Sequence, residues 1–147
     1  MKSASQQWEW GFESLALRVR HRRTANSEWL MAFKFEHLEI WKLACEFCEK
    51  LHAVTKRFPK SELFGLTSDL NRAGVSIPAN IAEGSGSDSE REFKRYLGIA
   101  VKSLFEVVSH LFIAKMRGYL KDEEFATLYA DAETLVKKIK SFKKMLE

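Results

Sequence analysis

Residues that break helices or form disulfides are scarce in this chain, which has two prolines, seven glycines and two cysteines among 147 residues. So few prolines and glycines argue against an all-β fold with many turns. Two cysteines cannot form a disulfide framework, and they fit a reducing compartment. No apolar run approaches the roughly 20 residues that cross a bilayer, and no basic segment followed by an apolar one marks a signal peptide. We therefore expect a cytoplasmic protein with no membrane partner.

The composition is typical of one globular domain. Hydrophobic residues make up 46% of the chain and charged residues 30%, and a chain of this length can bury a complete hydrophobic core. The formal net charge is +4 and the isoelectric point is near 9.1. This mild basicity is compatible with an anionic partner and does not require one.

Residues 1–32 differ in pattern from the rest, because their apolar residues follow no sustained helical or strand period. They carry arginines at positions 18, 20, 22 and 23. An arginine-rich arm could contact nucleic-acid phosphates, whereas the glutamates in this segment fit a targeting peptide poorly. We favour a disordered N-terminal extension, or a start assigned too early with Met31 beginning the complete protein. The folded domain is placed at residues 33–147.

Apolar residues recur at spacings of three and four from Phe35 onward, which predicts α-helices with one buried face each. Pro59 ends the first helix, and Gly84 with the Ser-Gly-Ser run after it ends the second. The third helix ends near Gly118, and Asp122 begins the fourth. The predicted core residues are Ile40, Ala44, Phe47, Leu51, Val54, Phe58, Leu63, Leu66, Leu70, Ala73, Ile77, Phe93, Leu97, Ala100, Leu104, Val107, Leu111, Ala114, Phe125, Leu128, Ala132, Leu135, Ile139, Phe142 and Leu146.

The four predicted helices are similar in length and closely connected. Ser89 is expected to cap the third, with Glu92 reaching back as a capping box, although Ser87 with Glu90 is an equally permitted frame. Each helix takes some 20 to 30 residues, or roughly 30 to 45 Å. Short connections between such helices place neighbours antiparallel. The sequence therefore predicts an all-α fold, an antiparallel up-down-up-down four-helix bundle.

The segment Ser76–Gly84 breaks the regular pattern, because it contains Pro78 and places the polar Asn80 at an apolar step. Proline crowds the carbonyl group four residues earlier, so we expect the helix to bend there. Asn80 is expected to satisfy the backbone groups that the bend frees, or to bridge to Ser103 and Glu106 on the third helix.

A catalytic site made of two carboxylates and an amide is another interpretation of Glu83, Glu106 and Asn80. A buried polar network that sets the helix register is the better interpretation. No nucleophile with a base, phosphate-binding loop or metal triad accompanies these residues in the sequence. We therefore predict no enzymatic activity and no cofactor. The predicted structural motif consists of Ser76, Pro78, Asn80, Glu83, Gly84, Ser103 and Glu106.

Several runs of residues resemble one bacterial family. The strongest is Ser-Ile-Pro-Ala-Asn-Ile-Ala-Glu-Gly at positions 76–84, and another is Phe-Glu-His-Leu-Glu-Ile-Trp at positions 35–41. They resemble the four-helix-bundle family known from intervening sequences in 23S ribosomal RNA genes. This resemblance implies a non-enzymatic bundle that assembles as a homo-oligomeric ring, often a pentamer. The chain also resembles accessory proteins of diversity-generating retroelements, which implies a basic pentameric barrel that binds a reverse transcriptase and nucleic acid.

Cys45, Cys48 and His52 lie on one flank of the first predicted helix, below Trp41. A metal site is one interpretation, but Cys45 and His52 are separated by a rise of roughly 10 Å, and metal–ligand bonds are only about 2.0–2.3 Å long. Packing or a subunit contact is the better interpretation, since free cysteine commonly behaves as a small hydrophobe. We predict no metal site and assign Trp41, Cys45 and Cys48 to a subunit contact.

Lysines crowd the end of the fourth predicted helix. By helical phase, Lys137, Lys140 and Lys144 lie away from the core, so we expect a basic outer strip there. The strip could follow nucleic-acid phosphates, or it could be a solvated face that suits the negative end of the helix dipole. The predicted function is binding of RNA or a ribonucleoprotein by an oligomeric bundle. The alternative is a protein–protein adaptor or scaffold that binds no nucleic acid.

Overall fold

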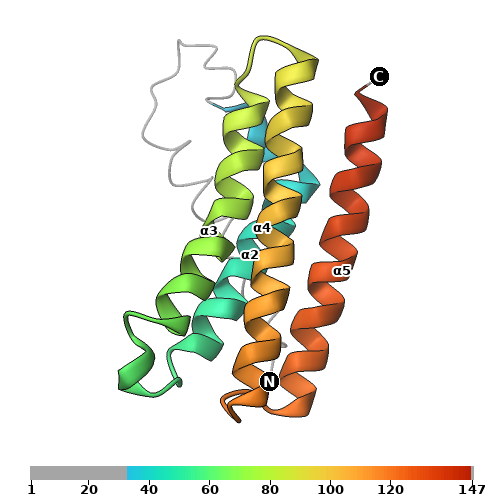
Figure 1. The fold of residues 1–147 in the computed structure, drawn as a ribbon. Coiled ribbons are helices and arrows are strands. Elements are labelled where there is room, and N and C mark those ends of the chain that lie inside the picture. Colours follow the sequence, from blue (N-terminus) through green and yellow to red (C-terminus); the bar gives the residue numbers. More distant parts are fainter. Residues whose placement is uncertain (1–32, 147) are drawn as a thin grey trace, which may run out of the picture. The chain divides into compact units, whose positions relative to one another are not determined.

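Four long helices account for most of residues 33–146, the part of the chain that the computed structural model describes (Figure 1). They are α2 (Glu39–Thr55), α3 (Leu66–Ser85), α4 (Glu90–Met116) and α5 (Asp122–Met145), with the short 3₁₀ turns η1 (Lys34–His37) and η2 (Lys60–Glu62). The all-α, four-helix prediction is confirmed. The predicted N-terminal extension and its arginines lie outside the described residues, so that assignment stays a prediction.

Side-chain contacts show how neighbouring helices run. Between α3 and α4, Ser76 contacts Ser103, and Glu83 contacts Tyr96. Residue numbers therefore rise along α3 while they fall along α4, as the colours of Figure 1 also show. The other neighbouring helices, α2 with α3, α4 with α5 and α2 with α5, also run in opposite directions. The contacts that show this are Cys48–Gly74, Thr55–Asn71, Phe93–Phe142, Phe112–Phe125, Glu39–Lys138 and Arg57–Glu124.

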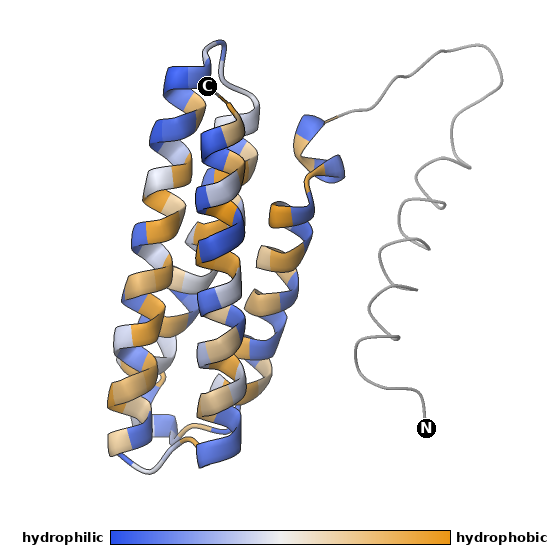
Figure 2. Cartoon of the chain, turned by 90° about the vertical axis from the view of Figure 1, so that its right-hand side faces the viewer, coloured by the Kyte–Doolittle hydropathy of each residue, from blue (hydrophilic) through white to orange (hydrophobic). Residues whose placement is uncertain are grey.

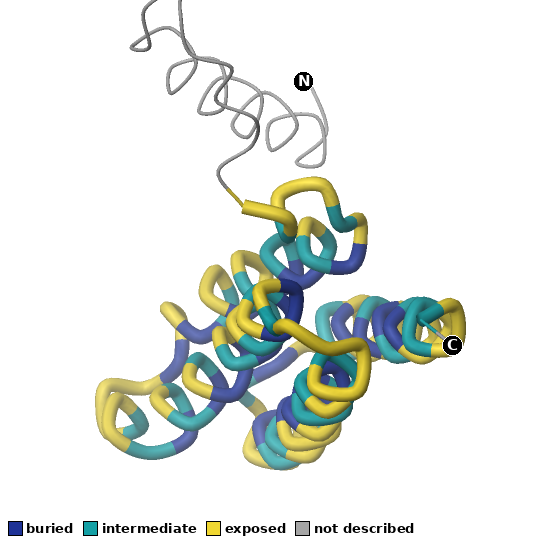
Figure 3. The backbone as a smooth tube through the Cα atoms, turned by 90° about the horizontal axis from the view of Figure 1, so that it is seen from above, coloured by how far each residue is buried: buried dark blue, intermediate teal, exposed yellow. Residues whose placement is uncertain are grey.

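The core lies along the centre of the bundle, where the buried faces of all four helices meet (Figure 3). Apolar and polar residues alternate along each helix with the helical period, so that each has one apolar face (Figure 2). Leu104, Val107 and Leu111 of α4 are completely buried. Burying one such side chain contributes about 1.5–3 kcal/mol to stability.

Leu63 is the one predicted core residue that is wrong, because its side chain is 56% exposed. The second helix was expected to include Leu63. Instead Pro59 is followed by the turn η2, and α3 begins only at Leu66, after Gly65. The helical phase that buries Leu66 therefore does not extend back to Leu63.

The predicted starts of the third and fourth helices are observed, with one difference in capping. Ser89 caps α4, and its Oγ accepts a hydrogen bond from the backbone N–H of Glu92 at 3.2 Å. Helix α5 begins at Asp122 as predicted. Its cap comes from Glu124, whose carboxylate accepts the backbone N–H of Lys121 at 3.1 Å. Gly118 follows α4 with φ of 74°, a left-handed conformation that glycine adopts without strain.

Helix α4 is, among the described residues, the only helix long and apolar enough to cross a membrane by length and composition. Its buried residues, which include Leu97, Ala100 and Leu104, contribute to the same core as residues of the other three helices. A core helix of a bundle meets the same length and composition criterion. This finding therefore leaves the four-helix interpretation unchanged.

Candidate functional site

Pro78 lies inside α3, which continues unbroken from Leu66 to Ser85. Because proline has no N–H, the carbonyl group of Gly74 loses the hydrogen bond that a helix would otherwise supply. The thiol of Cys48, from α2, donates to the Gly74 oxygen at 2.8 Å. Gly74 is buried, and a Cβ there would lie 2.9 Å from Leu51 Cδ1. The glycine thus lets α2 approach closely enough for the thiol to reach this carbonyl.

Removing the Cys48 thiol is expected to destabilise the protein. Cys48→Ala would leave the buried Gly74 carbonyl without a donor, which costs about 1–3 kcal/mol. Cys48→Ser keeps a donor and is expected to remain closer to wild type. Urea unfolding of the two variants tests this, and equal losses of stability in both would contradict the role of the hydrogen bond.

The hydrogen bonds of Asn80 within residues 33–146 stay inside its own helix. Its Nδ2 donates to the backbone oxygen of Ser76 at 2.7 Å and to Ser76 Oγ at 3.0 Å, both within α3. The Ser76 hydroxyl in turn contacts Ser103 Oγ at 2.9 Å, and Ser103 donates to the Ile99 carbonyl at 3.2 Å. A polar network between α3 and α4 therefore exists, but Asn80 reaches Ser103 only through Ser76.

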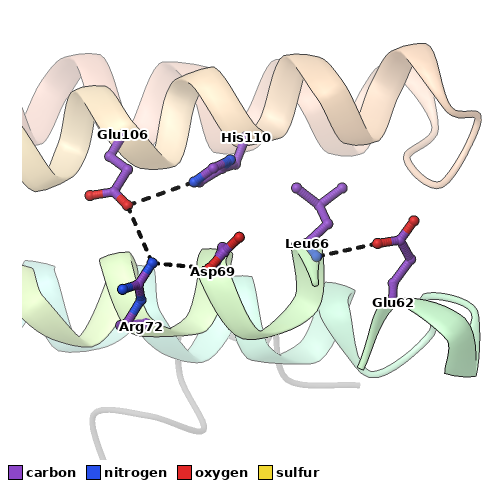
Figure 4. A network of polar contacts seen from close by, with 6 residues as sticks. All are labelled: Glu62, Leu66, Asp69, Arg72, Glu106 and His110. Atoms are coloured by element: carbon purple, nitrogen blue, oxygen red, sulfur yellow. Dashed lines mark hydrogen bonds and ion pairs between the residues drawn. The ribbon is translucent and has the colours of Figure 1, made fainter. Parts of the chain in front are cut away.

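The predicted bridge from Asn80 to Glu106 is wrong. Glu106 lies about 4–5 Å beyond Ser103 along α4, whereas Asn80 lies about 6 Å beyond Ser76 in the opposite direction. Glu106 instead lies 4.0 Å from Arg72 and 3.7 Å from His110 Nε2 (Figure 4). His110 Nδ1 is buried and has no hydrogen-bond partner within residues 33–146.

Glu83 lies neither in the network of Ser76 and Ser103 nor in the ion-pair group of Glu106. Its side chain is exposed and accepts a hydrogen bond from the Tyr96 hydroxyl at 3.0 Å. Asn80, Glu83 and Glu106 therefore do not converge on one point, and they form no acid pair with an amide. Within the predicted motif, Ser76, Asn80 and Ser103 form one hydrogen-bond network, whereas Glu106 lies in a separate ion-pair group.

The flank that carries Trp41, Cys45 and Cys48 has partners within the chain. Cys48 contacts α3 as described, and the Trp41 ring lies 4.7 Å from the ring of Phe35. Each helix of a four-helix bundle faces two neighbours, which is why α2 is apolar on a second flank. The subunit contact assigned to Trp41, Cys45 and Cys48 stays a prediction, although Cys48 and Trp41 already have partners within the chain.

Both thiols are held in their protonated form. Burial, followed by nearby Glu46 and Glu49, raises the pKa of Cys45 to about 11. Burial also raises the pKa of Cys48 to about 12, with smaller contributions from Cys45 and Glu49. Neutral thiols are poor nucleophiles and poor metal ligands. Within residues 33–146, no three His, Cys, Asp or Glu side chains are placed to hold a metal ion.

Glu62 joins the two turns at one end of the bundle, a role that its position in the sequence did not reveal. Its carboxylate accepts the backbone N–H of Leu66 at 3.2 Å, Arg117 Nη1 at 2.8 Å and the Tyr119 hydroxyl at 3.1 Å. The Leu66 N–H, then the Tyr119 and Arg117 contacts, lower the pKa of Glu62 below its ordinary value of 4.5. The α2–α3 turn is thereby tied to the turn after α4.

We expect Glu62→Gln to destabilise the protein in a pH-dependent way. Because the pKa of Glu62 is lower in the folded state, its stabilising effect is complete above pH 4.5 and is lost as the pH falls through the lowered value. The stability difference between wild type and Glu62→Gln should therefore be largest near pH 7 and shrink toward pH 3. Urea unfolding across this range measures it, and a difference independent of pH would contradict the assignment.

The predicted lysine strip is exposed, but its three members differ. Lys137 forms an ion pair with Glu133 at 2.8 Å. Lys140 and Lys144 are exposed and have no ion pair with any residue in the described part of the chain. One turn of helix separates them, so both ammonium groups face outward on the same side of α5.

A cavity of about 60 Å³ lies between α2 and α5, beside Leu43, Phe47 and Leu135. It is far smaller than the roughly 300–1,000 Å³ of typical ligand pockets. Surfaces of the bundle are therefore better candidates for function than this cavity.

Comparison with known proteins identifies the family. The sequence model of the 23S rRNA-intervening sequence protein family matches residues 36–141. The chain belongs to this family. A crystal structure of an S23 ribosomal protein family member of unknown function from Bacteroides thetaiotaomicron VPI-5482 has the same fold as this chain, with a TM-score of 0.67. The two share 24% identity, over 71% of this chain and 98% of that chain. No curated protein matches the sequence.

Proposed function

We propose that this chain is a non-enzymatic bundle that binds RNA, or a ribonucleoprotein, through the outer face of α5. The observation that carries the proposal is the pair Lys140 and Lys144, exposed, one turn apart and without an ion-pair partner in the described chain. Unpaired lysines on one face attract phosphates by charge alone, and they release counterions when they bind. The two lysines also suit the negative C-terminal end of α5, which contributes to helix stability.

Assembly would strengthen this surface. The family resemblance implies a homo-oligomer, and each added copy would repeat Lys140 and Lys144. Repetition of a weak site raises avidity without any new contact. An oligomeric ring is therefore part of the proposal.

Fluorescence anisotropy with a labelled RNA, at about 50 mM and 200 mM salt, tests the proposal. We expect binding at the lower concentration and much weaker binding at the higher one, because contacts with phosphates depend steeply on salt. The absence of binding at 50 mM salt would exclude this function.

The alternative is a protein adaptor without nucleic-acid binding. It is favoured by exposed apolar side chains outside the lysine strip, above all Phe64, which is 93% exposed in the turn before α3. Capture of a protein partner by the wild type, lost in Phe64→Ala, together with no RNA binding at low salt, would support the adaptor.

A further inference from the structure

An aromatic cluster lies on the side of α5 that faces α4. Phe112 of α4 lies 4.9 Å from the ring of Phe125 and 6.2 Å from that of Tyr129. Phe112 is 47% exposed and Tyr129 is 42% exposed, so both rings are partly open to solvent. Lys115 Nζ lies 4.6 Å from the centre of the Phe125 ring. Exposed rings beside a cation form a surface on which flat, electron-rich groups can stack.

The lysines continue from this cluster along α5. Tyr129 and Lys140 are 11 positions apart, close to three whole turns, so they lie on one line along the helix about 16 Å apart. Lys144 is one turn further. Glu133 lies between Tyr129 and Lys140 on this side of α5, but its negative charge is paired with Lys137 at 2.8 Å. One face of α5 therefore offers aromatic rings at one end and unpaired positive charge at the other.

Helix α4 adds a second exposed ring to this face. Phe105 lies two turns from Phe112 on the same side of α4, and it is 63% exposed. Helices α4 and α5 pack side by side along their length, through Phe93–Phe142 at one end and Phe112–Phe125 at the other (Figure 1).

We propose that the α4–α5 face binds single-stranded RNA, with bases stacking on Phe105, Phe112 and Tyr129 and phosphates contacting Lys140 and Lys144. The inference rests on the proposed function and specifies its ligand. A duplex hides the faces of its bases, so it could use the lysines but not the rings. An apolar protein partner would match the rings but would leave the lysines without counter-charges. A single strand matches both the rings and the lysines, because it carries exposed bases along a chain of phosphates.

The test compares two probes in anisotropy titrations on the full chain. One is a 12-nucleotide RNA of mixed sequence without self-complementarity, and the other is the same strand annealed to its complement. The double variant Phe105→Ala/Tyr129→Ala should lose about tenfold or more in affinity for the single strand, since one stacked base is worth about this factor or more. Its affinity for the duplex should not change.

Phe64→Ala, which removes an exposed ring from the turn before α3, serves as the matched control and should bind both probes as wild type does.

The outcomes separate this inference from the proposed function. If the wild type binds both RNAs equally and the ring variant loses nothing, the stacking surface is refuted and RNA binding stands. If the wild type binds neither RNA, both proposals fail. If the ring variant binds RNA normally but changes its molar mass in light scattering, the rings form an interface between copies and the inference is overturned. Circular dichroism of the variant confirms that the helices remain folded in each comparison.

Discussion

Gly84→Ala is expected to lower the free energy of unfolding by about 1–3 kcal/mol. Gly84 is buried near the end of α3, where α3 and α4 approach each other. A Cβ there would lie 2.7 Å from both Phe93 Cδ2 and Tyr96 Cβ, and such distances require atoms to move. Because Tyr96 Cβ is attached directly to the α4 backbone, the two helices would have to separate. The loss should exceed the gain in helix propensity that alanine normally brings over glycine.

Gly98→Ala provides the matched control for this prediction. Gly98 also lies inside a helix, but a Cβ there would have an ordinary contact of 3.7 Å with Lys143 Nζ. Alanine is therefore expected to stabilise α4 by about 0.5–1 kcal/mol. Thermal unfolding of both variants should show shifts of opposite sign. A stabilising effect of alanine at both sites would show that α3 and α4 do not approach closely at Gly84.

The double variant Lys140→Gln/Lys144→Gln is expected to lose about tenfold or more in RNA affinity at low salt. Each lysine that contacts a phosphate contributes about one unit to the slope of log affinity against log salt, so the slope should fall by about two. Glutamine keeps a flexible polar side chain and removes the charge.

Lys56→Gln/Lys60→Gln is the control for charge itself. These two lysines are also exposed, and they lie near the α2–α3 turn, at the opposite end of the bundle from the end of α5. If both double variants lose the same affinity, binding follows net charge and not the α5 face.

The sequence was sufficient to predict the bundle because hydrophobic periodicity is a local signal. Apolar residues at spacings of three and four define the buried face of a helix, and this pattern can be recognised without knowing which helix packs against it. The prediction failed at Leu63, where Pro59 and Gly65 flank a turn that resets the helical phase. The Ser89 cap could be chosen between two frames only with the structure, because both sequence frames satisfy the capping pattern.

The contacts of the Ser76–Gly84 segment were less predictable, because they depend on residues distant in the sequence. That Pro78 would free the Gly74 carbonyl follows from the chemistry of proline, but its donor, Cys48, is 26 positions away. From the sequence alone, Cys48 is therefore assigned to a subunit contact. Glu62 was overlooked for the same reason, since Arg117 is 55 positions away and Tyr119 is 57. A glutamate before a helix signals a local cap at most.

Lysine footprinting tests the central claim, RNA binding by the outer face of α5, most directly. The protein is treated with an amine-reactive acylating reagent with and without RNA, and mass spectrometry measures the modification of each lysine. We expect RNA to protect Lys140 and Lys144 and to leave Lys56 and Lys60 as reactive as before. Protection of Lys56 and Lys60, with Lys140 and Lys144 still fully reactive, would contradict the account.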